Sequence, residues 1–520
     1  MVTASRSKKS SRAYFVHKPN GQIHQRVQAV GPEHFGIVSV DCAKLRSKFI
    51  LCDFFGNVLI PPTVLPHIQA DLQAAITRIR QAVEKHQLRD ILIAIEQTGV
   101  YHRPVQDAFR HAGWETRLVH PFASHQFRQP ADPANKTDDT DLAAIFRATV
   151  NGFGLLDPVW PDEYQQLQLF ARHRRDLVRK QAKLRCQIRV QIHRLMPGFA
   201  DCFADLFEYP AALAIACQIG SAQAMRDLGL PGLERVVNQA GLRCQRGTLS
   251  KILAWTQTAV APTPPLEPRR QILADLEADR QAKNKQILSM ERELARLLVH
   301  TPYLLLIVVP GLNVVSVAEL AGELGPITNY ANANRITGRA GLRPSRYQSD
   351  TVDRASGPLR RCSNRRLRCA LMQIADNLVN CNHHFNIRAL SYKQQNKNPR
   401  WIRIKVAKTF TRFAFAMVSS RSLFRHPCCQ ERHYILDKLL DFHQRRDNPM
   451  SLVLQDLDAA TGQLPRSSFA EEAKPLHERL ENIQNRKRGP QPLGEILPIV
   501  LARLGIHVIL STAAEELDPG

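Results

Sequence analysis

The stretch GIVSVDCAK, residues 36–44, decides the fold of the first part of this chain. Its apolar, β-branched residues show no helical periodicity, so they predict a strand buried inside a sheet. ILIAIEQTGVYHRP, residues 91–104, begins with a second run of the same kind. Asp41 follows the first run and Glu96 follows the second. Each carboxylate is therefore expected at the carboxyl end of a buried strand.

A third acidic segment, NKTDDTDLAAI at residues 135–145, predicts a helix that begins with carboxylates. Asp138 and Asp141 are three residues apart and share one helix face, whereas Asp139 points elsewhere. Taken singly, such acids are ordinary strand-end, surface or helix-capping residues, but their joint order suits a site for Mg²⁺, which prefers carboxylate oxygens. Two such ions stabilise both the entering and the leaving oxygen of a phosphoryl displacement. The predicted catalytic and metal-binding residues are Asp41, Glu96, Asp138 and Asp141.

The pattern around these acids predicts a layered α/β domain over residues 35–158. Three strands come first, and a hairpin at Gly56 and Asn57 joins the last two. Helices then alternate with two further strands, and the acidic helix comes last. Acids on the first strand, the fourth strand and the last helix are the layout of the ribonuclease H-like, or RuvC-like, fold.

The charge of the chain points to a polyanionic partner. Its 520 residues include 71 Lys and Arg against 47 Asp and Glu, a formal net charge of +24, which favours DNA or RNA as a partner. The polar and basic residues 1–34 predict a flexible extension that can touch nucleic-acid backbone. Eleven cysteines at irregular spacing without a secretory signal favour a cytoplasmic location with reduced thiols. No stretch reaches the roughly 20 apolar residues of a membrane helix, so no membrane partner is expected.

A long helical region is predicted over residues 159–300. Residues 162–196 and 268–298 carry apolar residues at helical spacing, and the second set has the alternating three and four spacing of a coiled-coil seam. The two helices either pack against each other or form a contact between two copies of the chain, and both alternatives stay open. Residues 199–262 are expected to form a small helical insertion.

A second constellation lies at residues 301–424, in a domain expected to be mostly α-helical. An apolar run, the turn Pro310-Gly311-Leu312 and a helix from about Ser316 resemble a helix-hairpin-helix, whose turn amides can hold phosphate. The following segment is dense in arginine, whose planar fork suits phosphate. Residues 425–520 predict a helical extension to which no role is assigned. The arginines expected to bind nucleic acid are Arg339, Arg343, Arg346, Arg360, Arg361, Arg365 and Arg366.

Together these segments resemble the Piv-type DEDD transposases and site-specific recombinases of bacterial insertion sequences, the IS110 family. The resemblance covers about residues 35–420. It lies in VDCAK at Asp41, IEQTGVY at Glu96, and KTDDTDLA, in which Leu142 replaces the usual alanine. It continues in PGLNVVSVAELAGELG, GLRPSRYQSD and SNRRLRCAL.

The resemblance implies a RuvC-like domain with a DEDD metal site and a transposase domain that supplies a serine nucleophile. The family's serine falls on Ser349, which is followed here by aspartate instead of the usual glycine. Ser356 does precede a glycine and is a second candidate, and the family's Gly-Asn is here Ser-Asn at 363–364. The resemblance also implies DNA partners at the element ends and the target, an element-encoded structured RNA, a dimer or tetramer, and a place in the bacterial nucleoid. A basic helix at residues 399–418 is compatible with binding that RNA or DNA alone.

Three functions fit this sequence. In the first, a transposase cuts and rejoins DNA through Ser349 while the acids hold Mg²⁺. In the second, the same metal site activates water, as in a RuvC-like structure-selective DNA nuclease. In the third, the protein binds nucleic acid and its metal site is inactive.

Overall fold

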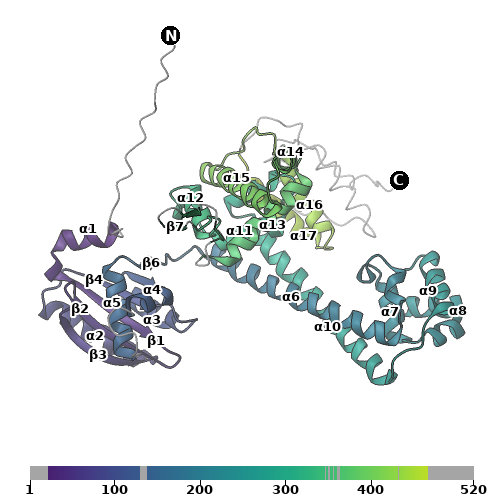
Figure 1. The fold of residues 1–520 in the computed structure, drawn as a ribbon, viewed down its shortest axis with the longest axis horizontal. Coiled ribbons are helices and arrows are strands. Elements are labelled where there is room, and N and C mark those ends of the chain that lie inside the picture. Colours follow the sequence, from purple (N-terminus) through teal and green to yellow (C-terminus); the bar gives the residue numbers. More distant parts are fainter. Residues whose placement is uncertain are drawn as a thin grey trace, which may run out of the picture. The chain divides into compact units, whose positions relative to one another are not determined.

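The computed structural model describes residues 21–128, 137–345, 347–349, 352–354, 357–359, 363–430 and 432–465. The chain divides into two compact units, residues 1–159 and 160–520 (Figure 1). Within the described ranges, none of the helices combines the length and the apolar content that crossing a bilayer requires.

A mixed six-stranded sheet forms the centre of unit 1, in the order β3-β2-β1-β4-β5-β6. β1 pairs antiparallel with β2, and β2 pairs antiparallel with β3. β4 runs parallel to β1 and β5 parallel to β4, while β6 returns antiparallel to β5. The carboxyl ends of β1 and β4 therefore meet at the same edge of the sheet. The strands are β1 (Phe35–Cys42), β2 (Arg46–Asp53), β3 (Val58–Pro66), β4 (Asp90–Glu96), β5 (Thr116–Val119) and β6 (Gly154–Leu156).

Apolar clusters lie on both faces of this sheet. Val38 and Val40 of β1 pack in one cluster with residues of α2 and α3. Phe35 and Ile37 of the same strand pack in another cluster with residues of α1 and α5. Alternation of side chains between two buried faces explains why β1 is an almost continuous apolar run. The helices are α1 (Gly21–Val30), α2 (Gln69–Lys85), α3 (His102–His111), α4 (Pro121–Arg128) and α5 (Asp138–Val150).

Helix α1 corrects the expectation of a flexible extension over residues 1–34. Ile23 and Val27 are 1% and 6% exposed and pack in the same cluster as Ile37. The Arg26 guanidinium binds Asp90 at the start of β4, with Nη2 at 2.6 Å from Oδ1 and Nε at 2.8 Å from Oδ2. Two apolar residues four apart are enough to dock one helical turn on the sheet. Residues 1–20 lie outside the described residues.

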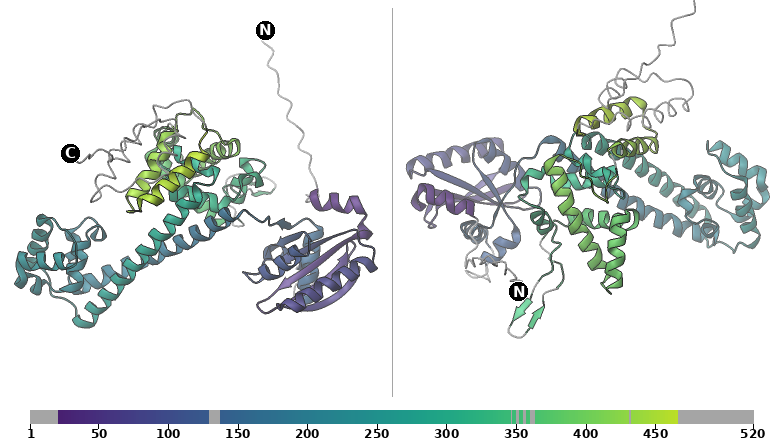
Figure 2. Two further views of the ribbon diagram at one scale, coloured as in Figure 1. Left: turned by 180° about the vertical axis from the view of Figure 1, so that it is seen from behind. Right: turned by 90° about the horizontal axis from the view of Figure 1, so that it is seen from above.

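Two long helices, α6 (Asp162–Leu195) and α10 (Leu266–Leu298), run side by side in unit 2 (Figures 1 and 2). Their apolar residues share clusters at both ends of the pair, Leu167 with Leu294 and Ile188 with Leu273. Of the two alternatives left open by the sequence, the structure thus shows packing within one chain.

The insertion packs at one end of this helical pair. Its residues share an apolar cluster with Ile188, Leu195 and Leu273 of the long helices. The elements are the 3-10 helices η2 (Phe199–Cys202) and η3 (Leu206–Glu208) and the helices α7 (Pro210–Gln218), α8 (Ala222–Gln239) and α9 (Arg246–Thr258).

A helical bundle packs at the other end of the pair around one large apolar cluster. It begins with η4 (Pro302–Val308), which is a 3-10 helix, so the expected helix-hairpin-helix lacks an α-helix in its first position. Every residue from Tyr303 to Val308 is buried, so this segment is a core segment and not an amphipathic surface helix. The other elements are α11 (Val314–Leu324), η5 (Ile327–Asn329), α12 (Ala333–Arg339), β7 (Tyr347–Ser349), β8 (Val352–Arg354), α13 (Arg365–Cys381), α14 (His383–Gln394), α15 (Pro399–Ser420), α16 (His433–Gln444) and α17 (Met450–Gln463).

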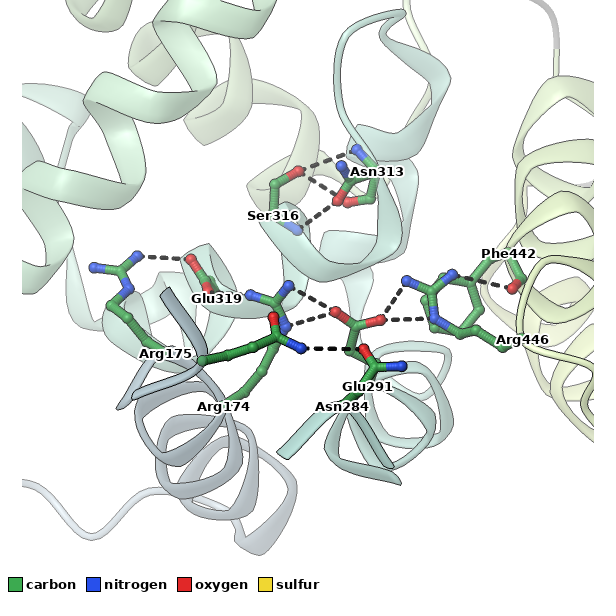
Figure 3. Close-up of polar contacts among 10 residues, drawn as sticks. Arg174, Arg175, Asn284, Glu291, Asn313, Ser316, Glu319, Phe442 and Arg446 are labelled. Carbon is green, nitrogen blue, oxygen red and sulfur yellow. Dashed lines mark hydrogen bonds and ion pairs between the residues drawn. The ribbon is translucent and has the colours of Figure 1, made fainter. Parts of the chain in front are cut away.

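A buried carboxylate joins the last helices of the bundle to the long helical pair. Figure 3 shows Glu291 of α10 between Arg174 of α6 and Arg446, which follows α16. The Arg174 Nε lies 2.7 Å from Oε1 and the Arg446 Nε lies 2.7 Å from Oε2. Glu291 is only 5% exposed, so both of its oxygens depend on these guanidiniums.

Candidate active site

Asp41 and Glu96 lie next to each other at the carboxyl edge of the sheet. Val40 pairs with Ile95 in the parallel ladder between β1 and β4, which places the two acids one residue beyond the same rung. Their side chains are within hydrogen-bonding reach of each other. Both are partly buried. Adjacent parallel strands thus bring together two carboxylates that are far apart in the sequence.

The pKa of Asp41 shows that the other predicted acids also lie nearby. Burial, as the largest cause, and the negative charges of Glu96 and Asp141 together raise this pKa from 3.8 to about 6. The hydrogen bond with Glu96 and the charge of Asp138 act in the same direction. Like charges disfavour ionisation of a carboxyl group only at short range. The structure therefore places all four predicted carboxylates near one edge of the sheet, within the range at which the charges of the other three act on Asp41.

The start of α5 fixes the two acids that come from the helix. Thr137 caps α5, because its Oγ1 accepts a hydrogen bond of 3.2 Å from the Thr140 amide, and Thr140 Oγ1 accepts one of 3.0 Å from the Thr137 amide. Asp141 is buried, whereas Asp139 is exposed and its Oδ1 lies 2.7 Å from Lys48 Nζ. Asp139 is thus held by a cation of β2.

Helix α4 supplies two partners of the acids that the sequence did not reveal. The Arg128 Nη1 lies 2.5 Å from Asp141 Oδ1, and both side chains are largely buried. The Ser124 hydroxyl donates a hydrogen bond to Glu96 Oε1. A proline at the first helical position, Pro121, was the signal that could have identified this helix after β5.

The donor chemistry of this acidic cluster, defined as Asp41, Glu96, Asp138 and Asp141, suits a divalent cation. In the described ranges, no group of three or more His, Cys, Asp and Glu side chains lies close enough together to hold a metal ion as it stands. Arg128 instead neutralises Asp141, and Asp41 shares a hydrogen bond with Glu96. A bound dication would take over both tasks, because it supplies the positive charge that the crowded carboxylates lack.

Ser349 lies in unit 2, on a short hairpin. It is exposed and is the last residue of β7, where it pairs with Val352 of β8. Figure 2 shows this hairpin projecting from the helices of its unit. Its base is closed by hydrogen bonds of 2.9 Å from the Ser345 amide to Pro358 and from the Gly357 amide to Ser345. The second serine candidate, Ser356, lies outside the described residues.

The predicted arginines differ in their surroundings. Arg339 donates to the Tyr330 hydroxyl and stacks 5.9 Å from the Trp160 ring centre, so it helps to hold the bundle together. Arg343 is exposed, and its Nη2 donates a hydrogen bond of 3.2 Å to the Asn334 carbonyl. Two further arginines are exposed in the first turn of α13, and three lie outside the described residues. The exposed pair is Arg365 and Arg366, and those outside are Arg346, Arg360 and Arg361.

Two family models match this chain. The first, described as a transposase, matches residues 38–197. The second, described as a transposase of the IS116/IS110/IS902 family, matches residues 304–389. The first match includes the whole acidic cluster, and the second includes Ser349. Comparison with curated proteins gives no match.

Proposed function

Because the chain belongs to the IS110 family of transposases, we propose that it cuts and rejoins DNA at the ends of its own insertion sequence and at a target site. The observation that supports this proposal best is the acidic cluster, in which burial and the neighbouring acids together raise the pKa of Asp41 to about 6. Carboxylates crowded in this way are typical of a site built for cations. A positively charged chain then binds the polyanionic substrate.

In this proposal the acidic cluster holds two Mg²⁺ ions through Asp41, Glu96, Asp138 and Asp141. When bound, the ions stabilise negative charge on the entering and leaving oxygens of a phosphoryl displacement. Arg128, which pairs with Asp141, would lie beside these ions as a phosphate-binding guanidinium. Ser124 keeps one oxygen of Glu96 oriented, so that the carboxylate enters the site in a fixed position.

Ser349 supplies the nucleophile. Its Oγ loses its proton and forms a bond to phosphorus, the bond from phosphorus to the deoxyribose oxygen breaks, and the leaving oxygen takes up one proton, so that the step is proton-neutral. The reverse attack by a DNA hydroxyl on the phosphoserine rejoins the strand without an external energy source. The exposed position of Ser349 at the end of β7 suits contact with a DNA backbone.

Trapping of the phosphoserine tests this function. The full-length protein is incubated with Mg²⁺ and a DNA of the element end that carries a nick, so that rejoining is blocked. The expected result is a denaturant-resistant adduct with the unaltered protein and with Ser356→Ala, and no adduct with Ser349→Ala. An adduct that persists in Ser349→Ala and disappears in Ser356→Ala assigns the nucleophile to the other serine.

A RuvC-like nuclease is the second candidate, because the acidic cluster is complete within unit 1. Such an enzyme uses water as the nucleophile, so Ser349→Ala would cut DNA at the unaltered rate and no variant would form an adduct. A protein with an inactive site would bind DNA without any Mg²⁺-dependent cutting. The RNA partner and the multimer implied by the family belong to the same proposal. Sequencing of copurified nucleic acid tests the RNA partner, and a mass measurement in solution tests the multimer.

A further inference from the structure

One face of α15 carries a row of cations without carboxylate partners. Lys405, Lys408 and Arg412 follow one another at spacings of three and four, so they share this face. Arg343, which follows α12, lies close enough for its charge to act on Lys408. Among the described residues, none of these four cations forms an ion pair, whereas Arg403 of the same helix lies 2.6 Å from Asp376. Lys405, Lys408 and Arg412 thus form one continuous row of positive charge on α15.

The surroundings of Lys408 show how close these cations lie. Burial lowers its pKa, and the positive charges of Lys405, Arg343 and Arg412 lower it further. Like charges at such spacings on a helix repel each other and destabilise it. An external polyanion would remove this repulsion.

Trp401 holds the first cation of the row in place. The Lys405 Nζ lies 4.8 Å from the Trp401 ring centre, and the Lys397 Nζ lies 6.0 Å from it. Tyr392 contacts the same ring edge-on, with the ring centres 5.2 Å apart. Contact with an aromatic ring orients an ammonium group but does not neutralise its charge. The positive charge is therefore positioned before any ligand binds.

The geometry of the row fits a nucleic-acid backbone. Lys405 and Arg412 are seven residues apart, which corresponds to roughly 10 Å along a helix that rises about 1.5 Å per residue. One strand of duplex DNA presents a phosphate about every 3.4 Å along its axis, so two or three successive phosphates lie within this length. The ring of Trp401 already carries a cation, which argues against an unpaired base stacked on it.

We propose that the α15 basic face, defined as Arg343, Lys405, Lys408 and Arg412 with Trp401, binds the phosphate backbone of duplex DNA without reading its sequence. Trp401 and the three cations of α15 lie outside both family matches, whereas Arg343 lies inside the second. The inference rests on the proposed function for its partner, DNA, but not on the acidic cluster or on Ser349. EDTA removes the divalent ions that DNA cutting requires, so DNA binding measured in EDTA tests this face separately from the proposed cutting activity.

The test compares two triple variants of the full-length protein that lose equal charge. One is Lys405→Gln, Lys408→Gln and Arg412→Gln on the α15 basic face. The control is Arg179→Gln, Lys180→Gln and Lys183→Gln on the exposed surface of α6. A labelled DNA duplex of arbitrary sequence, in EDTA and at several KCl concentrations, reports affinity by fluorescence anisotropy.

The first triple is expected to weaken binding at least about tenfold and to lower the salt slope of log K by about 2–3, since each phosphate contact contributes about 0.9. The control is expected to change both quantities much less. Equal effects of the two triples would overturn the proposal, because net charge alone would explain them. If the first triple weakened binding to a duplex RNA of the same sequence but not to the DNA duplex, this result would also overturn the proposal. If the triple fails to fold, Lys405→Gln alone is expected to lower the slope by about 1, and an unchanged slope in this variant would overturn the proposal.

Discussion

Replacing Asp41 by asparagine is expected to stabilise unit 1, although it removes a residue of the acidic cluster. Burial and the neighbouring acids raise the pKa of Asp41 from 3.8 to about 6. One pKa unit corresponds to about 1.4 kcal/mol, so the ionised carboxylate opposes folding by at most about 3 kcal/mol above pH 6. Asp41 is partly exposed, and solvent screening reduces this figure to roughly 1–2 kcal/mol.

The sign of this effect follows from proton binding. Between pH 3.8 and about 6 the folded state holds more protons at Asp41 than the unfolded state does. The stability of the fold therefore falls as the pH rises through this window. Below the window Asp41 is protonated in both states and opposes folding no longer. The gain from Asp41→Asn is thus largest at pH 7 to 8 and shrinks as the pH approaches 4.

Calorimetry in EDTA measures this gain without interference from divalent ions. The melting temperature of unit 1 in Asp41→Asn is expected to rise by about 3–8 °C at pH 8. Asp139→Asn is the matched control, because Asp139 is exposed and paired with Lys48, so its loss changes stability by no more than about 1 kcal/mol and in the opposite direction. A lower melting temperature for Asp41→Asn at pH 8, or an equal gain for Asp139→Asn, would refute the reasoning.

Three further predictions concern single contacts. Glu291→Gln leaves Arg446 without a carboxylate in a buried setting, so the free energy of unfolding measured in urea is expected to fall by about 3 kcal/mol. The control Glu293→Gln, two residues along α10 and more exposed, is expected to change this free energy by less than about 1 kcal/mol. Similar effects of both substitutions would contradict the role of Glu291. Gly322→Ala places a Cβ 2.8 Å from the Gln168 nitrogen of α6, so the free energy of unfolding is expected to fall by about 1–3 kcal/mol in the same urea assay. An unchanged urea midpoint would show that α11 and α6 are not in such close contact. Arg128→Gln removes the cation that competes with a metal ion for Asp141, so Mn²⁺ is expected to bind several-fold more tightly. A titration followed by electron paramagnetic resonance measures this affinity. Weaker binding would show that Arg128 supports the site instead.

The sequence predicted the centre of unit 1 because local patterns determine it. Apolar runs buried on both faces identified β1 and β4, and β4 ends at Glu96 while β1 ends one residue after Asp41. The acids before an apolar segment identified the start of α5, and the structure adds Thr137 as its cap. A parallel pairing of β1 with β4 then brings Asp41 next to Glu96, which follows from the topology alone.

The partners of the acids could not be predicted, because they depend on contacts between distant segments. Arg128 and Ser124 are ordinary surface residue types, and only the placement of α4 directs them toward Asp141 and Glu96. The same holds for Arg446, which binds Glu291 from 155 residues away. Such ion pairs leave no periodic signal in the sequence, unlike the spacing that identified α6 and α10.

The central claim is that the acidic cluster binds divalent ions as one site, and Mn²⁺ binding to the full-length protein tests it most directly. The account predicts saturable binding that weakens at least about tenfold in Glu96→Gln and in Asp141→Asn, since removal of one carboxylate ligand deprives a hard cation of a preferred oxygen. It also predicts unaltered binding in Asp139→Asn. Absence of saturable binding in the unaltered protein, or an equal loss in Asp139→Asn and Asp141→Asn, would contradict it.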